Sequence, residues 1–220
     1  MTRKLPDHEL VYRQIREMIL FGELVPGQAV TIQGLVHELG VGMTPVREAI
    51  RRLTAEGALQ TRGNRRICLP ELSPAQLDEL SFARLAIEPH IAALACERMN
   101  TADIGALKDI DDSLNVAIAQ GNVRAYLEFN YRFHATLYRH SGARILTTIA
   151  GTLWLRLGPS LRVVRGRFGT ANLPDKHKEA LAGLAARDPL AVARAIGEDL
   201  NQGHEGIRAS FQSGAKGELD

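Results

Sequence analysis

The chain has 220 residues, of which 45% are hydrophobic, 24% are charged and only 5% are aromatic. This length fits one large domain or two small ones, and few aromatic residues among many alanines favour helices over sheets. Lys and Arg number 27 and Asp and Glu number 25, and the net charge of +2 excludes a protein that is basic throughout. No apolar run reaches the ~18 residues that a membrane helix needs, and no apolar leader is expected. Two cysteines cannot form a disulfide framework, so we expect a reduced, cytoplasmic protein.

The first part of the chain predicts three helices, the last two of which form a helix-turn-helix. Residues 8–21 carry apolar side chains at helical spacing and are followed by a glycine. Thr31 is expected to cap a short second helix that Gly40 ends. Thr44 is expected to cap the third helix, with Pro45 at its first position, where the missing N–H costs nothing. Two helices joined by a short turn that contains glycine are typical of DNA-binding proteins.

A β-hairpin with a basic tip is expected after the third helix. Residues 58–61 and 67–69 suit short strands, and Gly63-Asn64 between them is a turn pair. A hairpin in this position predicts a wing that contacts the phosphate backbone or the minor groove.

Arginines concentrate in these same elements. The segment 42–66 holds six arginines and two glutamates, so the small positive surplus of the chain lies there. Arg47 and Arg51 are four residues apart and share one face of the third helix, from which an arginine can bond guanine in the major groove. A charge run alone is also compatible with a solvated helix face. The candidate DNA-binding residues are Thr44, Arg47, Arg51, Arg52, Arg62, Arg65 and Arg66.

The second part of the chain shows only helical patterns. A linker from Pro70 to Pro74 separates a winged helix-turn-helix domain, residues 1–72, from a second domain, residues 73–220. Helices are expected at 75–98, 101–119, with Thr101 as the cap, 123–140, 143–165, 175–186 and 189–210, with a loop at 166–173. The fold class is therefore predicted as mainly α, with an all-helical bundle after the winged domain.

Four polar side chains of the bundle form a candidate metal site. Asn130 and His134 are four residues apart and share a helix face. His177 and Asp199 each lie eleven residues, about three turns, from Asp188, so an antiparallel fold of the last two helices brings them to one height. Bundle cores commonly hold such ligand sets. A buried histidine is more often only hydrogen-bonded, so spacing alone leaves a structural role open.

Two groups of motifs resemble known families. The segments Gly22-Glu-Leu-Val-Pro-Gly27 and Val41-Gly-Met-Thr-Pro-Val-Arg-Glu-Ala-Ile-Arg-Arg-Leu53 resemble the winged-helix signature of GntR-family bacterial regulators, although Gly42 and Met43 replace the usual Ser/Thr-Arg. The segments Arg84-Leu-Ala-Ile-Glu88, Asn130-Tyr-Arg-Phe-His134 and His177-Lys-Glu-Ala-Leu181 resemble the FCD effector domain of the FadR-like subgroup.

This resemblance implies a homodimeric regulator, with repression as the expected sign, on a palindromic double-stranded operator. It also implies a divalent metal (Zn²⁺, Ni²⁺ or Mn²⁺) and a small carboxylate effector. Asn130 stands where the family usually has aspartate, and Asp199 stands where it usually has the last histidine. The candidate effector-binding residues are Arg84, Tyr126, Tyr131 and Arg156.

Two other interpretations of the metal site stay open at this point. Two histidines and a carboxylate resemble the facial triad of non-haem iron enzymes, although no nucleophile or general base accompanies them. Alternatively, the metal is purely structural and no effector binds. The enzyme interpretation leaves the arginine-rich segment 44–66 unexplained, so a DNA-binding regulator without enzyme activity is the preferred interpretation.

Overall fold

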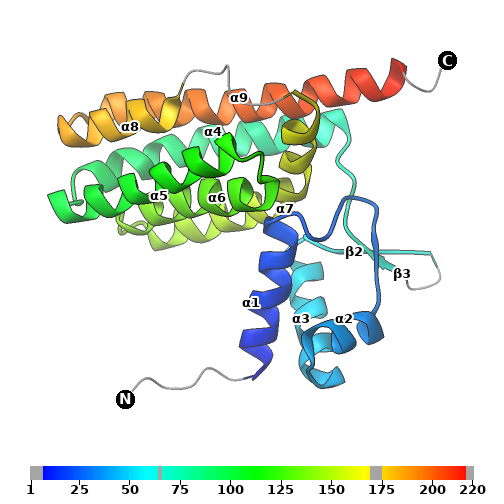
Figure 1. Ribbon diagram of the computed structural model, residues 1–220. Helices are drawn as coiled ribbons and strands as arrows, with labels where there is room; N and C mark the ends of the chain where they lie inside the picture. The colour runs from blue at the N-terminus through cyan, green and yellow to red at the C-terminus, as the bar shows by residue number, and fades with distance from the viewer. Residues whose placement is uncertain (1–6, 64–65, 169–174, 217–220) are drawn as a thin grey trace.

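The computed structural model describes residues 7–63, 66–168 and 175–216, and Figure 1 shows a helical bundle standing on a smaller N-terminal unit. The N-terminal unit comprises α1 (Asp7–Leu20), β1 (Ala29–Val30), α2 (Ile32–Leu39), α3 (Met43–Ala55), β2 (Gln60–Arg62) and β3 (Arg66–Cys68). The strands form an antiparallel sheet in the order β1-β3-β2. The predicted winged helix-turn-helix is confirmed, and β1 adds a strand that the sequence did not predict.

Local capping explains where the two helices of the helix-turn-helix begin and end. The Thr31 side chain accepts a hydrogen bond from the Gly34 amide (3.0 Å), and Gly40 ends α2 at a φ of 63°, a left-handed conformation that glycine adopts without strain. The expected cap of α3 was wrong by two residues. Gly42 is the N-cap, without a side-chain bond, and Thr44 lies inside the first turn.

The bundle comprises α4 (Pro74–Cys96), α5 (Thr101–Ala119), α6 (Val123–Arg139), α7 (Arg144–Phe168), α8 (Lys176–Ala185) and α9 (Pro189–Lys216). Asn100, rather than Thr101, caps α5, because its side chain accepts from the Asp103 amide while Asp103 bonds back. The loop expected at 166–173 was wrong at its start, since α7 continues to Phe168. Residues 169–174 lie outside the described residues. No helix in the described ranges is both long and apolar enough to cross a membrane.

The two units share one hydrophobic core. Ile15 and Ile19 of α1 belong to the same buried cluster as Leu127 of α6 and Leu155 of α7. In Figure 1, α1 descends from the bundle beside α3, so it is the element that joins the two units. A second core lies within the bundle, around Phe133, and brackets the polar site described next.

Candidate metal centre

Three side chains from three helices converge inside the bundle. His134 on α6, His177 on α8 and Asp199 on α9 offer ligand atoms that all lie within 4.8 Å of one another. The two histidine Nε2 atoms are 3.2 Å apart, and Asp199 Oδ2 lies 3.0 Å from His134 Nε2. The other Asp199 oxygen lies 3.7 Å from His177 Nε2. Both histidines are almost fully buried, whereas Asp199 is partly exposed toward a cavity.

The turn between α8 and α9 creates this convergence. Asp188 accepts hydrogen bonds from the amides of Leu190 and Ala191, which starts α9 directly after α8 ends. Gly183 allows the two helices to approach, because a Cβ there would lie 2.9 Å from the Val192 side chain. His177 and Asp199 each lie eleven residues from Asp188, and the antiparallel packing of α8 and α9 places them side by side, as the spacing predicts.

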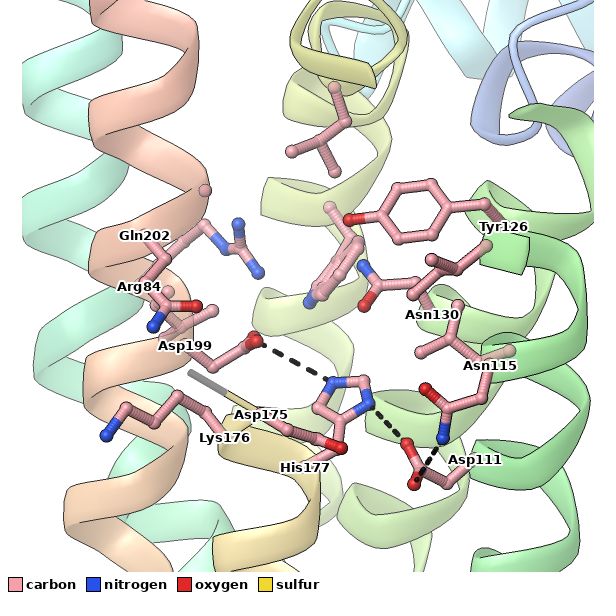
Figure 2. A pocket seen from close by; sticks show the side chains of 16 residues that line it. Arg84, Asp111, Asn115, Tyr126, Asn130, Asp175, Lys176, His177, Asp199 and Gln202 are labelled. Carbon is pink, nitrogen blue, oxygen red and sulfur yellow. Dashed lines mark hydrogen bonds and ion pairs between the residues drawn. The ribbon is translucent and has the colours of Figure 1, made fainter. Parts of the chain in front are cut away.

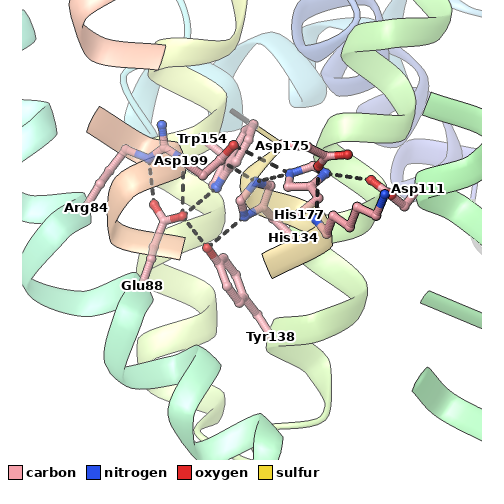
Figure 3. A network of polar contacts seen from close by, with 10 residues as sticks. Arg84, Glu88, Asp111, His134, Tyr138, Trp154, Asp175, His177 and Asp199 are labelled. Atoms are coloured by element: carbon pink, nitrogen blue, oxygen red, sulfur yellow. Dashed lines mark hydrogen bonds and ion pairs between the residues drawn. The ribbon is translucent and has the colours of Figure 1, made fainter. Parts of the chain in front are cut away.

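Outer hydrogen bonds orient both imidazoles. His177 Nδ1 donates to Asp111 Oδ1 (3.1 Å), and Tyr138 donates its own proton to Glu88 Oε2 (2.6 Å). Tyr138 therefore accepts from His134 Nδ1 at 3.1 Å, since its single proton is already used. Both Nδ1 atoms are thereby engaged by outer partners, and the two Nε2 atoms face a common centre (Figure 3).

Burial and neighbouring charges set the protonation of the centre. Burial lowers the pKa of His134 and outweighs the opposing effect of Asp199. Burial also disfavours the His177 imidazolium, but Asp199 and Asp111 together outweigh it, so the pKa of His177 is raised. For Asp199, burial raises the pKa, yet His177 and His134 overcome this effect and lower the pKa to about 2. Asp199 is therefore ionised, and the centre holds a carboxylate and two inward-facing ring nitrogens.

The spacing of these atoms fits one transition-metal ion. Two nitrogens bound at ~2.1 Å to one ion, at angles between octahedral and tetrahedral, lie roughly 3.0–3.4 Å apart. The observed separation of 3.2 Å between the Nε2 atoms falls in that range. Two lone pairs facing each other at this distance repel unless a proton or a cation lies between them. The donor set of two imidazoles and one carboxylate suits Zn²⁺, Ni²⁺ or Mn²⁺.

A cavity of about 240 Å³ opens beside the centre (Figure 2). Asn130 points into it from α6, and Tyr126 and Arg84 line it as well. Arg84 is buried and donates to both carboxylate oxygens of Glu88, at 2.6 and 3.1 Å. The two charged residues of the Arg-x-x-x-Glu motif therefore form an ion pair with each other. Arg84 nevertheless keeps a face on the cavity and lies over the Trp154 ring.

Two of the expected effector residues lie elsewhere. Tyr131 faces a different cavity, between the bundle and the N-terminal unit, where its hydroxyl accepts from Arg16 (3.0 Å). Arg156 is exposed and donates to the Glu56 carbonyl at the end of α3 (3.2 Å). Sequence spacing could not separate these residues from the metal cavity, because both helices face two cavities along their length.

Asp111 is a residue of the candidate site that sequence reasoning missed. It is buried, accepts from His177, and also accepts from Asn115 (3.4 Å). A signal was present, because Leu107, Asp111 and Leu114 follow one another at helical spacing on the buried face of α5. An acidic residue within an apolar stripe needs a partner, and here the partner is a histidine.

The expected DNA-binding residues form an exposed surface on α3 and the wing. Thr44, Arg47 and Arg51 are exposed, and Arg51 contacts Glu48 at 3.4 Å. Arg66 is exposed on β3, and Arg62 on β2 pairs with Glu71 (3.3 Å).

Two arginines of the expected set stand apart from this surface. Arg52 is held within the fold, because it pairs with Glu9 (2.9 Å) and Glu56 (3.1 Å) and stacks over the Tyr12 ring. Arg65 lies outside the described residues.

Comparisons with known proteins agree with this architecture. Residues 8–68 match the family of bacterial regulatory proteins, gntR family, and residues 79–202 match the FCD domain. The HTH-type transcriptional regulator McbR of Escherichia coli (strain K12) is 29% identical over 195 residues, covering 87% of this chain and 88% of that protein. The HTH-type transcriptional repressor RspR of the same strain is 25% identical over 207 residues, covering 92% and 90%.

Solved structures show the same fold. The structure of E. coli McbR/YncC aligns with a TM-score of 0.86 at 27% identity and covers 96% of this chain and 99% of that chain. A GntR regulator from Rhodococcus sp. RHA1 aligns with a TM-score of 0.73 at 16% identity, covering 92% and 97%. The chain therefore belongs to the gntR family of bacterial regulatory proteins, carries an FCD domain, and is a DNA-binding transcriptional regulator rather than an enzyme.

Proposed function

We propose that this regulator is a cytoplasmic homodimer that represses transcription from a palindromic operator and responds to a small organic acid. A divalent metal held by His134, His177 and Asp199 forms part of the effector site, with Asn130 as a further oxygen donor. The single observation that carries this proposal is the pair of imidazole Nε2 atoms, 3.2 Å apart beside Asp199, whose rings are held from behind by Asp111 and Tyr138. Such outer hydrogen bonds are the usual companions of metal-bound histidines.

The charge of the cavity explains why the effector is expected to be a carboxylate. The lining carries the acidic residues Asp111, Asp175 and Asp199 and the basic residues Arg84 and Lys176, which leaves a net charge of −1 with neutral histidines. When bound, a divalent ion would raise this charge to +1 and supply open coordination positions. Arg84 and Asn130 would then orient the effector, and burial of Arg84 strengthens its attraction for an anion. We therefore expect carboxylate binding only in the metal-loaded protein.

On the DNA side, the proposal rests on α3. The amides of its first turn receive no side-chain cap from Gly42, which leaves them to bind a phosphate. Arg47 stands free on the exposed face and would read a base, while Arg66 on the wing would contact the backbone. A dimer presents two such heads and so matches a palindrome. The relative RspR is named a repressor, which favours that sign here.

The test combines metal content with operator binding. The purified protein is analysed for bound metal, and its operator affinity is measured at fixed salt with and without a panel of small carboxylates. The wild type is expected to respond to one of them only when metal is present. His177→Ala should abolish that response while operator binding without effector persists, and His90→Ala, at an exposed position of α4, should behave as wild type.

Two results would contradict the proposal. A protein that binds no divalent metal, or whose His177→Ala variant binds metal as the wild type does, has no centre of this kind. Metal binding without any carboxylate response would instead identify a structural metal.

A further inference from the structure

A second cavity, of about 320 Å³, lies between the N-terminal unit, from here on called the reading head, and the bundle. Tyr12, Arg16 and Arg52 line it from the head, whereas Tyr131 and Gly151 line it from the bundle. An apolar cavity of about 150 Å³ is enough to hold benzene, so this one has room for a substituted ring. It is separate from the metal cavity, and the indole of Trp154 forms part of both walls.

The lining of this interdomain cavity is aromatic. Tyr131 and Trp154 meet edge to face with their centroids 5.7 Å apart, and Tyr12 and Tyr138 complete a wall of four rings. Aromatic rings favour a planar apolar partner that can stack or meet their edges.

The lining also carries excess positive charge. Arg16, Arg52 and Arg139 line the cavity, while Glu56 is its only carboxylate in the parts of the chain that the structure describes. Glu56 and Glu9 neutralise Arg52, but neither Arg16 nor Arg139 has an ion-pair partner among the described residues. Within the described parts of the chain, Arg16 donates to two neutral oxygens, the Tyr131 hydroxyl (3.0 Å) and the Gly151 carbonyl (3.4 Å), and Arg139 donates to the Thr136 hydroxyl (2.8 Å).

We propose that the interdomain cavity is a second ligand site, distinct from the metal centre, for a small aromatic carboxylate. The ring of the ligand would lie among Tyr12, Tyr131 and Trp154, and its carboxylate would bond the guanidiniums of Arg16 and Arg139. Two unpaired guanidiniums beside an aromatic wall suit this chemistry, because bidentate arginine–carboxylate bonds are strong and directional. The inference does not depend on the metal.

Such a ligand would touch both units at once. It would contact α1 and α3 of the head together with α6 and α7 of the bundle, so its binding would favour the present arrangement of head and bundle. Occupancy would thereby influence operator binding by a route that does not pass through the metal centre.

The chain carries its own reporter of occupancy, because Trp154 is its only tryptophan. Benzoate, salicylate and phenylacetate are titrated into the full-length protein in the presence of a chelator, and Trp154 fluorescence is recorded. Chelation removes any contribution from the metal cavity. Benzamide, which has the same shape as benzoate without its charge, tests the requirement for an anion.

Two variants and two matched controls locate the binding. Gly151→Leu fills the cavity, and it should fold because an added Cβ there meets only the end of Arg16, at 3.7 Å. Gly105→Leu, at an open position of α5, is its control. Arg139→Ala removes one guanidinium, and Arg132→Ala, on the same helix but paired with Glu128, is its control.

The expected result is saturable quenching by at least one carboxylate, abolished in Gly151→Leu and weakened about tenfold or more in Arg139→Ala, the loss of one charge-assisted hydrogen bond. Both controls should bind as the wild type. The proposal is overturned if no carboxylate binds at millimolar concentration, if binding survives in Gly151→Leu, or if benzamide binds as well as benzoate.

Discussion

At the scale of single residues, the function of a side chain depends on what lies behind it. His177 is a candidate metal ligand because Asp111 holds its far nitrogen, and Arg52 is held away from the predicted DNA-binding residues by two glutamates and a tyrosine. The pairing of His177 with Asp199 could be predicted by counting turns from Asp188, and the i, i+4 spacing placed His134 on one face with Asn130. The outer partners could not, because α5 reaches the site only through the tertiary packing of the bundle.

Replacing Asp111 by Asn should weaken metal binding by roughly 10- to 100-fold, the usual effect of losing an outer hydrogen-bond acceptor. The amide retains the shape of the carboxylate but not its charge, so it orients the His177 ring less firmly. Isothermal titration with Zn²⁺ measures the change. Asp112→Asn, at an exposed position paired with Lys108, is the control, and equal affinities for the two variants would refute an orienting role for Asp111.

Arg47 and Arg52 lie on the same helix, but replacing them should have different effects, on operator affinity and on stability respectively. Arg47→Ala should weaken specific operator binding by ~1–3 kcal/mol, because an exposed base-reading contact is lost. Arg52→Ala should instead lower the melting temperature, since it removes contacts with Glu9, Glu56 and the Tyr12 ring. Fluorescence anisotropy with operator DNA at fixed salt, together with thermal melting, separates the two effects. Unchanged operator affinity in Arg47→Ala would exclude base reading by this residue.

At the scale of elements, the close contact of α8 with α9 sets the geometry of the candidate metal centre. Helix boundaries in this region could be predicted from Asp188 and Pro189, which cap and open α9. The predicted N-caps of α3 and α5 were wrong by one or two residues, because the caps are Gly42 and Asn100. Threonine, glycine and asparagine are all acceptable at an N-cap, so the sequence alone does not choose between neighbouring candidates. It also missed β1, which is two residues long and exists only through pairing with β3.

Gly183→Ala should push α8 away from α9. The added Cβ would lie 2.9 Å from Val192 Cγ2 and 3.1 Å from the Val192 backbone nitrogen, which cannot move without shifting the helix. We expect a loss of ~1–3 kcal/mol in stability, the usual cost of overpacking, and weaker metal binding as His177 moves from Asp199.

Chemical denaturation and metal titration measure both effects of the Gly183 substitution. Gly105→Ala meets no atom within 4 Å and should be neutral or slightly stabilising. If Gly183→Ala is as stable as Gly105→Ala and retains metal affinity, the close approach of α8 and α9 is not needed for the site.

At the scale of the whole molecule, the N-terminal unit and the bundle form one packed body. The family comparisons and the charge map divide the chain into a reading head and a bundle, and the boundary after residue 72 stays a prediction. Yet the buried cluster around Ile15 and Ile19 continues into α6 and α7 without interruption. The sequence does not predict that the core continues from α1 into the bundle, because an apolar stripe on α1 has the same pattern whichever domain it packs against.

A shared core predicts cooperative unfolding. Ile19→Ala should lower the free energy of unfolding by ~2–5 kcal/mol, the usual cost of a buried large-to-small change. It should also lower the melting temperature of both units together. Differential scanning calorimetry of the wild type should show a single transition whose van't Hoff and calorimetric enthalpies agree. Two resolved transitions, of which only one shifts in Ile19→Ala, would show that the units unfold independently.

The placement of α1 also bears on how such regulators can be recombined. A chimera that joined residues 1–72 to an unrelated FCD domain would leave the inner face of α1 opposite a surface that evolved with other side chains. Grafting would therefore require the facing positions of α6 and α7, such as Leu127 and Leu155, to travel with the head. New operator specificity is more simply obtained by exchanging the exposed residues of α3, such as Arg47 and Arg51, because they do not belong to the core that the two units share.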